Sequence, residues 1–131
     1  MTRQFRSNSR GVKAYQSSAV KTASKEKVLL MLYEGLFKFI DEAKTHIEAE
    51  DFAKKGEYIV KSLAIVNELQ CSLNFNVDQD LCSDLDALYG YVSDRLTEAN
   101  FEMSLEALED ARSVLVTLYE GFKVAVEEVS V

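Results

Sequence analysis

Proline and tryptophan are absent from this sequence of 131 residues, and glycine is scarce, with five copies. Proline interrupts the hydrogen bonding of a helix and glycine weakens it, so their rarity lets most of the chain form helix. The apolar content of 47% is enough to close one modest core. We therefore expect one folded domain built of α-helices.

Sequence features of metal sites, cofactor sites and membrane spans are also missing. Cys71 and Cys82 form no CxxC or metal-ligand spacing, and without a signal peptide we expect reduced thiols in a cytosolic protein. No apolar run approaches the ~20 residues that cross a bilayer, so no membrane insertion is expected. Glycine-rich phosphate loops are absent, and Ala43 stands where a di-iron motif would place glutamate before His46. The sequence predicts no enzyme, no catalytic residue, no metal and no cofactor.

The charge of the chain is unevenly distributed. Residues 1–25 carry six bases and no acid, which gives this segment a charge of +6. The remaining residues carry 9 bases and 22 acids, a charge of −13, and the two parts sum to the net charge of −7. An acidic body of this kind repels phosphate backbones, so nucleic-acid binding is not expected. We expect residues 1–24 to form a flexible basic segment and residues 25–131 to form the folded domain.

Apolar residues recur at three- and four-residue steps in four segments, which predicts four amphipathic helices. The first is expected from about Lys25 to Glu50, and the others carry stripes at residues 59–73, 81–99 and 105–126. The segment Asn74 to Asp80 is rich in side chains that compete with helical hydrogen bonds, so it is expected to be a loop. Short connections of this kind predict an antiparallel up-down-up-down four-helix bundle.

Residues at the predicted helix ends have side chains suited to capping. Ser24, Asp51 and Ser104 can each accept a hydrogen bond from a free backbone amide and are the expected N-caps. Asn100 is expected to end the third helix in a left-handed conformation. Gly35 and Gly121, in the near repeat of Leu32-Tyr-Glu-Gly-Leu36 and Leu118-Tyr-Glu-Gly-Phe122, are expected to let a neighbouring helix approach closely.

The first and third helices carry more apolar residues than one stripe requires. The run from Val28 to Tyr33 is apolar on every side, Phe37 lies off the main stripe, and the third helix adds Tyr89 and Tyr91. A chain of this length cannot bury such a helix at the centre of a large protein. We therefore expect the basic segment or a partner chain to cover part of this surface.

His46 leaves a second class of protein open. A histidine phosphotransfer domain is also a small acidic helical bundle, with one exposed histidine. Such domains usually have lysine and glycine one turn after the histidine, whereas Ile47-Glu-Ala-Glu-Asp51 follows His46. The dipole at the end of a helix favours a protonated imidazole, which explains His46 without a special role.

Four stretches, spread from about Gly11 to Lys123, carry a family pattern. They are Gly11-Val-Lys-Ala-Tyr15, Ala23-Ser with Leu30-Met-Leu-Tyr-Glu-Gly35 and Lys38-Phe39, Lys55-Gly-Glu57, and Leu88-Tyr-Gly-Tyr91 with Arg95-Leu96 and Glu98-Ala-Asn100. In these stretches the sequence resembles the flagellin-specific export chaperones, the FliS family. The family commonly has proline where this chain has Lys25, and often has glycine in the first interhelical turn, where this chain has Glu50.

The resemblance implies a cytosolic chaperone that binds the disordered C-terminal segment of flagellin, prevents premature polymerisation and delivers flagellin to the export gate. Apolar anchors of the partner would enter grooves between the helices. The implied flagellin-binding residues are Leu32, Tyr33, Leu36, Phe37, Leu88, Tyr91, Leu96 and Asn100. An adaptor bundle for another secreted cargo is a further alternative.

The resemblance also assigns a role to the basic segment. Val12 and Tyr15 occupy the positions that dock the export-gate protein FlhA in related chaperones. The segment from Val12 to Val20 is expected to fold over the apolar groove, because its positive charge opposes the acidic body. Flagellin would displace it, so that only the loaded chaperone presents the docking residues.

Overall fold

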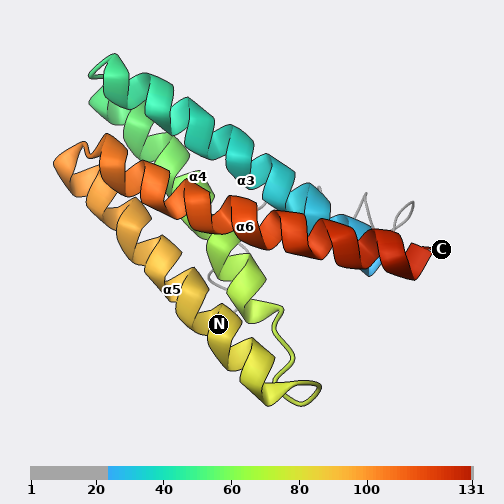
Figure 1. Cartoon of the computed structure of the whole chain (residues 1–131). Coiled ribbons are helices and arrows are strands. Elements are labelled where there is room, and N and C mark those ends of the chain that lie inside the picture. Colours follow the sequence, from blue (N-terminus) through green and yellow to red (C-terminus); the bar gives the residue numbers. More distant parts are fainter. Residues whose placement is uncertain (1–23, 131) are drawn as a thin grey trace.

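The computed structural model describes residues 24–130, and these residues form four α-helices. With the labels of Figure 1, the helices are α3 (Lys25–Glu48), α4 (Phe52–Cys71), α5 (Gln79–Glu102) and α6 (Leu105–Ser130). The predicted all-α fold is confirmed. The predictions for Val12, Tyr15 and the rest of residues 1–23 lie outside the described residues.

Each helix begins at a side chain that accepts a hydrogen bond from the backbone amide three residues later. For the predicted caps Ser24, Asp51 and Ser104, these hydrogen bonds measure 3.3, 3.1 and 3.0 Å. Asp78 does the same for α5 at 3.0 Å. Local capping chemistry therefore fixes where each helix starts, as predicted for three of the four.

The ends of two helices differ from the prediction. Helix α3 stops at Glu48 rather than Glu50, because Glu50 adopts a positive φ of 56° and turns the chain toward α4. The left-handed residue at the end of α5 is Met103, with φ of 54°, and the prediction for Asn100 is wrong. Asn100 stays helical, where its carbonyl and its side chain both accept hydrogen bonds from Lys55 of α4.

The helices form an antiparallel up-down-up-down bundle, which confirms the predicted architecture. Helices α3 and α5 each pack against both α4 and α6, and successive helices run in opposite directions (Figure 1). The turns at residues 49–51 and 103–104 lie at the same end, which we term the closed end. The opposite end, termed the open end, contains the start of α3, the end of α6 and the loop at residues 72–78.

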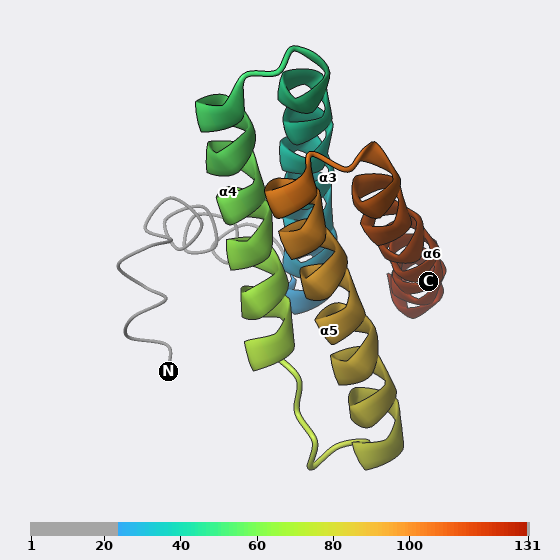
Figure 2. The same ribbon diagram turned by 90° about the vertical axis from the view of Figure 1, so that its left-hand side faces the viewer.

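The two helix pairs diverge toward the open end. In Figure 1, α3 and α6 run to the right, whereas α4 and α5 descend toward the loop between them. In Figure 2, α4 and α5 continue below the ends of α3 and α6. The last turns of the α4–α5 hairpin therefore receive less cover from the other two helices.

The core is a continuous cluster of apolar side chains from all four helices. Its members are Val28, Leu32, Tyr33, Leu36, Ile40, Ala43, Ile47, Ile59, Ile65, Val66, Leu69, Leu85, Tyr89, Val92, Leu96, Ala99, Ala107, Leu108, Ala111 and Leu115. Burying this surface is the main force that closes the bundle. Among the described residues, no helix combines the length and the apolar character needed to span a membrane.

Two glycines of the helices do not serve helix packing. Among the described residues, a Cβ added at Gly121 would meet nothing within 4 Å, so the expectation of a close helix approach there is wrong. Gly90, in the middle of α5, also faces open space. Both positions lie where α6 and α5 have no neighbouring atoms to accommodate. At Gly35 an added Cβ would meet Ile65 Cδ1 of α4 at 3.9 Å, which is an ordinary contact distance.

Candidate binding surfaces

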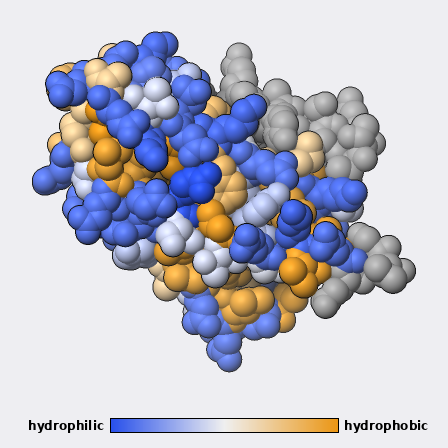
Figure 3. All heavy atoms as spheres, turned by 45° about the horizontal axis from the view of Figure 1, so that its top comes forward, coloured by the Kyte–Doolittle hydropathy of each residue, from blue (hydrophilic) through white to orange (hydrophobic). Residues whose placement is uncertain are grey.

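Ten large hydrophobic side chains are exposed among the described residues, and most of them lie in two groups. Phe52, Phe101 and Leu105 are at the closed end, and Phe75, Val77, Leu81, Leu88 and Tyr91 follow the α4–α5 loop and helix α5. Figure 3 shows hydrophobic residues as separate patches bordered by hydrophilic ones. Such patches on a small protein are typical of surfaces that bind another chain.

The members of the second group that lie on helix α5 are Leu81, Leu88 and Tyr91, and we term them the α5 strip. The spacing of seven and three residues places these side chains on one side of the helix. Tyr91 is 44% exposed, and its ring offers apolar area with a polar edge. Asp84 and Asp94 are exposed on the same helix and give the surface an acidic border.

Four of the residues predicted to contact the partner lie in the core. Tyr33, Leu36 and Leu96 are completely buried, and Leu32 is nearly so. Among the described residues of α3, no large hydrophobic side chain is exposed. The neighbouring helices α4 and α6 cover α3 on both sides.

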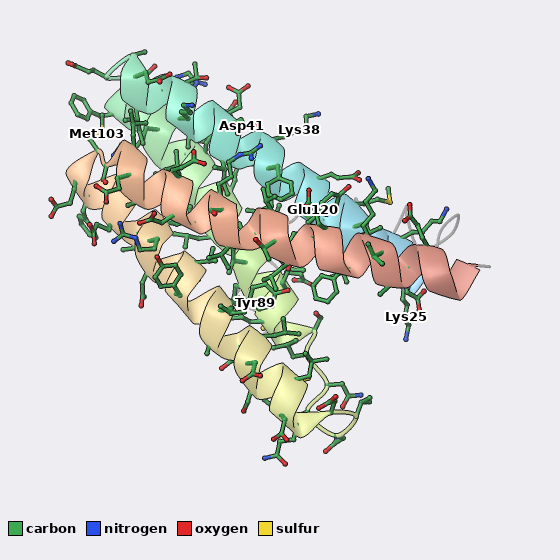
Figure 4. The ribbon with its side chains drawn as sticks, in the orientation of Figure 1. Lys25, Lys38, Asp41, Tyr89, Met103 and Glu120 are labelled. Carbon is green, nitrogen blue, oxygen red and sulfur yellow. The ribbon has the colours of Figure 1, made fainter. Side chains whose placement is uncertain are left out.

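Tyr33 joins helices that are not consecutive in the bundle. Its hydroxyl lies 2.6 Å from the hydroxyl of Tyr89, and this hydrogen bond between α3 and α5 is buried. Figure 4 shows Tyr89 on α5 in the region where the two helix pairs diverge. Burial raises the pKa of both tyrosines, because the phenolate would lose its hydration.

Phe37, the remaining predicted residue on α3, is half-buried between α3 and α6. Its ring packs edge-on against Tyr119 at a centroid distance of 5.5 Å and contacts Tyr33 at 6.3 Å. The guanidinium of Arg112 lies 5.1 Å from the centroid of the same ring. Phe37 thus holds α6 against α3 and leaves only part of its ring for a partner.

Asn100 is half-buried at the closed end, where it connects α5 to α4. The ammonium of Lys55 donates to the Asn100 carbonyl at 2.8 Å and to its Oδ1 at 2.9 Å. Lys55 itself is 7% exposed, which is unusual for lysine and was not anticipated from the sequence. The only signal was its place in the Lys55-Gly-Glu57 motif.

His46 lies beside the turn between α3 and α4 and is partly covered. Its ring stacks on Tyr58 at a centroid distance of 5.5 Å and an interplanar angle of 2°. The carboxylates of Glu42 and Asp51 lie 3.7 and 3.8 Å from its two ring nitrogens. These contacts give His46 a structural role between α3 and α4.

A hollow of about 360 Å³ lies between α3 and α6 near the closed end. Its lining is mostly charged, and within this lining Arg112 donates to both carboxylate oxygens of Asp41, at 2.9 and 3.3 Å. Figure 4 shows Asp41 on the side of α3 that faces α6. Because charged side chains line this hollow, the α5 strip and the closed-end residues are better candidates for an apolar partner.

This chain is a four-helix bundle with exposed apolar side chains along one helix and at one end. These features are typical of helical proteins that bind another chain. Residues 8–129 match the family model described as "Flagellar protein FliS". The chain therefore belongs to the FliS family of flagellar secretion chaperones. This family role is not enzymatic, and it implies a flagellar secretion substrate as the partner.

Individual relatives agree with this assignment. The flagellar secretion chaperone FliS of Bacillus subtilis strain 168 is 33% identical over 114 residues, which cover 87% of this chain and 84% of the relative. The FliS of Salmonella typhimurium strain LT2 is 30% identical over 118 residues, with coverages of 86% and 87%. A solved structure described as a flagellar chaperone from bacteria has a TM-score of 0.75 at 21% identity, covers 88% of this chain and 97% of its own, and shows the same fold.

Proposed function

We propose that this chaperone binds the disordered C-terminal segment of flagellin in the cytosol, prevents its premature polymerisation and delivers it to the export-gate protein FlhA. The observation that carries the proposal is the α5 strip, because its apolar side chains are exposed on a chain of the FliS family. A disordered segment that becomes helical can place apolar anchors on such a surface. Its ordering entropy keeps the affinity below that of a permanent complex, which suits a cargo that must be released.

The burial of the side chains narrows the proposed contact residues. Leu88 and Tyr91 are exposed and can be reached without a change in the bundle. Phe37 and Asn100 are half-buried and offer part of their surface. Leu32, Tyr33, Leu36 and Leu96 would act indirectly, by shaping the helices that carry the contacts.

Binding to flagellin that retains or lacks its C-terminal segment tests the proposed cargo. Isothermal titration calorimetry with purified proteins should show a complex with full-length flagellin and none with the truncated protein. A negative heat-capacity change should accompany binding, because apolar surface is buried. A complex that survives the truncation would contradict the proposed site on flagellin, and no complex with either protein would reject flagellin as the cargo.

The proposed delivery step assigns Val12 and Tyr15 to contact with FlhA and rests on the family resemblance. The double substitution Val12→Ala and Tyr15→Ala should leave flagellin binding intact but abolish binding to FlhA and reduce secretion. Removing residues 1–20 should tighten flagellin binding, since the segment would compete for the same surface. Normal secretion by the double variant, together with unchanged binding after truncation, would show that the segment is passive.

A further inference from the structure

The side-chain amide of Asn100 has its orientation set by Lys55. A lysine ammonium can only donate hydrogen bonds, so the amide atom at 2.9 Å from it must be the oxygen Oδ1. The amide nitrogen Nδ2 is therefore turned away from Lys55. It has no hydrogen-bond partner among the residues that the structure describes. It is also not buried, because among these residues Arg95 Nε is the one buried side-chain nitrogen without a partner. The Asn100 Nδ2 therefore keeps its access to solvent.

Lys55 is held firmly in this arrangement. Its ammonium has no carboxylate partner among the described residues, and it also donates to the backbone carbonyl of Asn100 at 2.8 Å. That carbonyl belongs to the last turn of α5, which contains no basic residue of its own. The Lys55 charge thus caps the negative end of the α5 dipole. Two hydrogen bonds from one nearly buried ammonium fix the position of the Asn100 amide.

The closed end, where this amide lies, also carries exposed apolar side chains. Phe101, the next residue of the chain, is 83% exposed, and Phe52, which precedes Lys55 by three residues on α4, is 63% exposed. Figure 4 shows the turn at Met103, which directly follows this part of α5, at the same end of the bundle as the turn between α3 and α4. A fixed amide donor at an end that also carries accessible aromatic rings suits an extended peptide, which offers backbone carbonyls and apolar side chains together.

We propose that Asn100 Nδ2 donates a hydrogen bond to a backbone carbonyl of the bound flagellin segment, and that Lys55 is the positioning residue that aims this donor. The inference rests on the proposed flagellin binding. It adds a polar contact at the closed end to the apolar contacts of the α5 strip. Because a backbone carbonyl is present in every residue, this contact recognises an extended chain and not a particular side chain.

The substitution Asn100→Asp separates the donor from the structural link. The carboxylate keeps an acceptor for Lys55 and forms a stronger, charge-assisted bond, so the melting temperature should stay the same or rise. The outward donor is lost, and flagellin should bind about tenfold more weakly, which corresponds to about 1.4 kcal/mol. Asn67→Asp, at an exposed position in α4, is the matched control for the added charge and should bind as the wild type does.

A double-mutant cycle tests whether Lys55 acts through Asn100. Lys55→Met should weaken flagellin binding in the wild-type background but have no further effect when residue 100 carries Asn100→Ala. Equal effects in both backgrounds would show a merely structural role for Lys55. Calorimetric titration of each variant gives the affinities, and circular dichroism verifies the fold.

Three outcomes would overturn the inference while leaving flagellin binding in place. These are wild-type affinity for Asn100→Asp, an equal loss for Asn67→Asp, and recovery of Asn100→Asp binding at raised ionic strength. The last would show charge repulsion instead of a lost donor. Absence of binding by the wild-type protein would instead reject the proposed function.

Discussion

Loss of the buried hydrogen bond between Tyr33 and Tyr89 should have an effect that depends on which hydroxyls are removed. Tyr33→Phe alone, or Tyr89→Phe alone, leaves the remaining hydroxyl without its partner in the core. An unpaired buried hydroxyl costs about 1–3 kcal/mol. We expect each single variant to lose about 2 kcal/mol of unfolding free energy, which lowers the melting temperature by roughly 6–10 °C.

The double variant should be less damaged than the sum of the two single variants. Replacing both partners by apolar rings of the same shape removes the unpaired group, so the double variant should be at least as stable as either single one. Tyr119→Phe is the matched control, because its hydroxyl donates to Glu34 on the exposed side of the same aromatic cluster. Urea unfolding followed by circular dichroism gives the four free energies. Additive losses in the double variant would refute a direct coupling between the two hydroxyls.

The same pair predicts how stability depends on pH. Burial raises the pKa of Tyr33 and Tyr89 in the folded protein, whereas an unfolded tyrosine titrates near pH ~10. The folded state therefore binds more protons than the unfolded state above about pH 10, and stability falls as the pH rises further. The two groups contribute up to about 2.7 kcal/mol per pH unit. The Tyr33→Phe and Tyr89→Phe double variant should lose this slope, and an unchanged slope would contradict the assignment.

Four further substitutions test separate parts of the structure. Tyr91→Asp should leave the fold intact and weaken flagellin binding by roughly tenfold or more, since it places a charge on the α5 strip. Leu96→Asp should instead unfold the bundle, because Leu96 is fully buried. Normal flagellin binding by a folded Tyr91→Asp variant in calorimetry would show that the contact surface lies elsewhere. His46→Ala should leave motility and secretion unchanged, and it should lower the unfolding free energy through the lost ring stack with Tyr58. Loss of motility in this variant, or phosphorylation of His46 by a kinase, would favour a phosphotransfer role. Gly121→Ala should raise the unfolding free energy by roughly 0.5–1 kcal/mol, because alanine favours the helix over glycine. The added Cβ meets no atom of the described residues within 4 Å. A lower melting temperature would show that this glycine is needed in the fold.

The parts of the fold set by local chemistry could be predicted from the sequence. Ser24, Asp51 and Ser104 cap helices as expected, because an N-cap depends on a side chain and an amide only three residues apart. The bundle architecture followed from four apolar stripes and short connections. Asp78 was missed as a cap because the acidic and amide residues around it offer several similar candidates.

The parts that depend on contacts between helices could not be predicted in this way. Tyr33 was assigned to flagellin binding through the family resemblance, but α4 and α6 flank its helix and its hydroxyl pairs with Tyr89 of α5 in the core. Asparagine is a residue type that often ends a helix, yet the tertiary hydrogen bonds from Lys55 keep Asn100 helical. For the candidate site, sequence alone found the helix that carries Leu88 and Tyr91 but could not separate exposed from buried positions along it.

The two short turns at the closed end bear on the order in which the bundle folds. They define two hairpins, α3 with α4 and α5 with α6, whose internal contacts link residues close in sequence near each turn. Bringing such residues together costs little loop-closure entropy, so we expect each hairpin to assemble rapidly on its own. The bond between Tyr33 and Tyr89 joins residues 56 positions apart and belongs to the later step in which the hairpins dock. A chain emerging from the ribosome can therefore complete α3 and α4 before the partner hairpin has been synthesised.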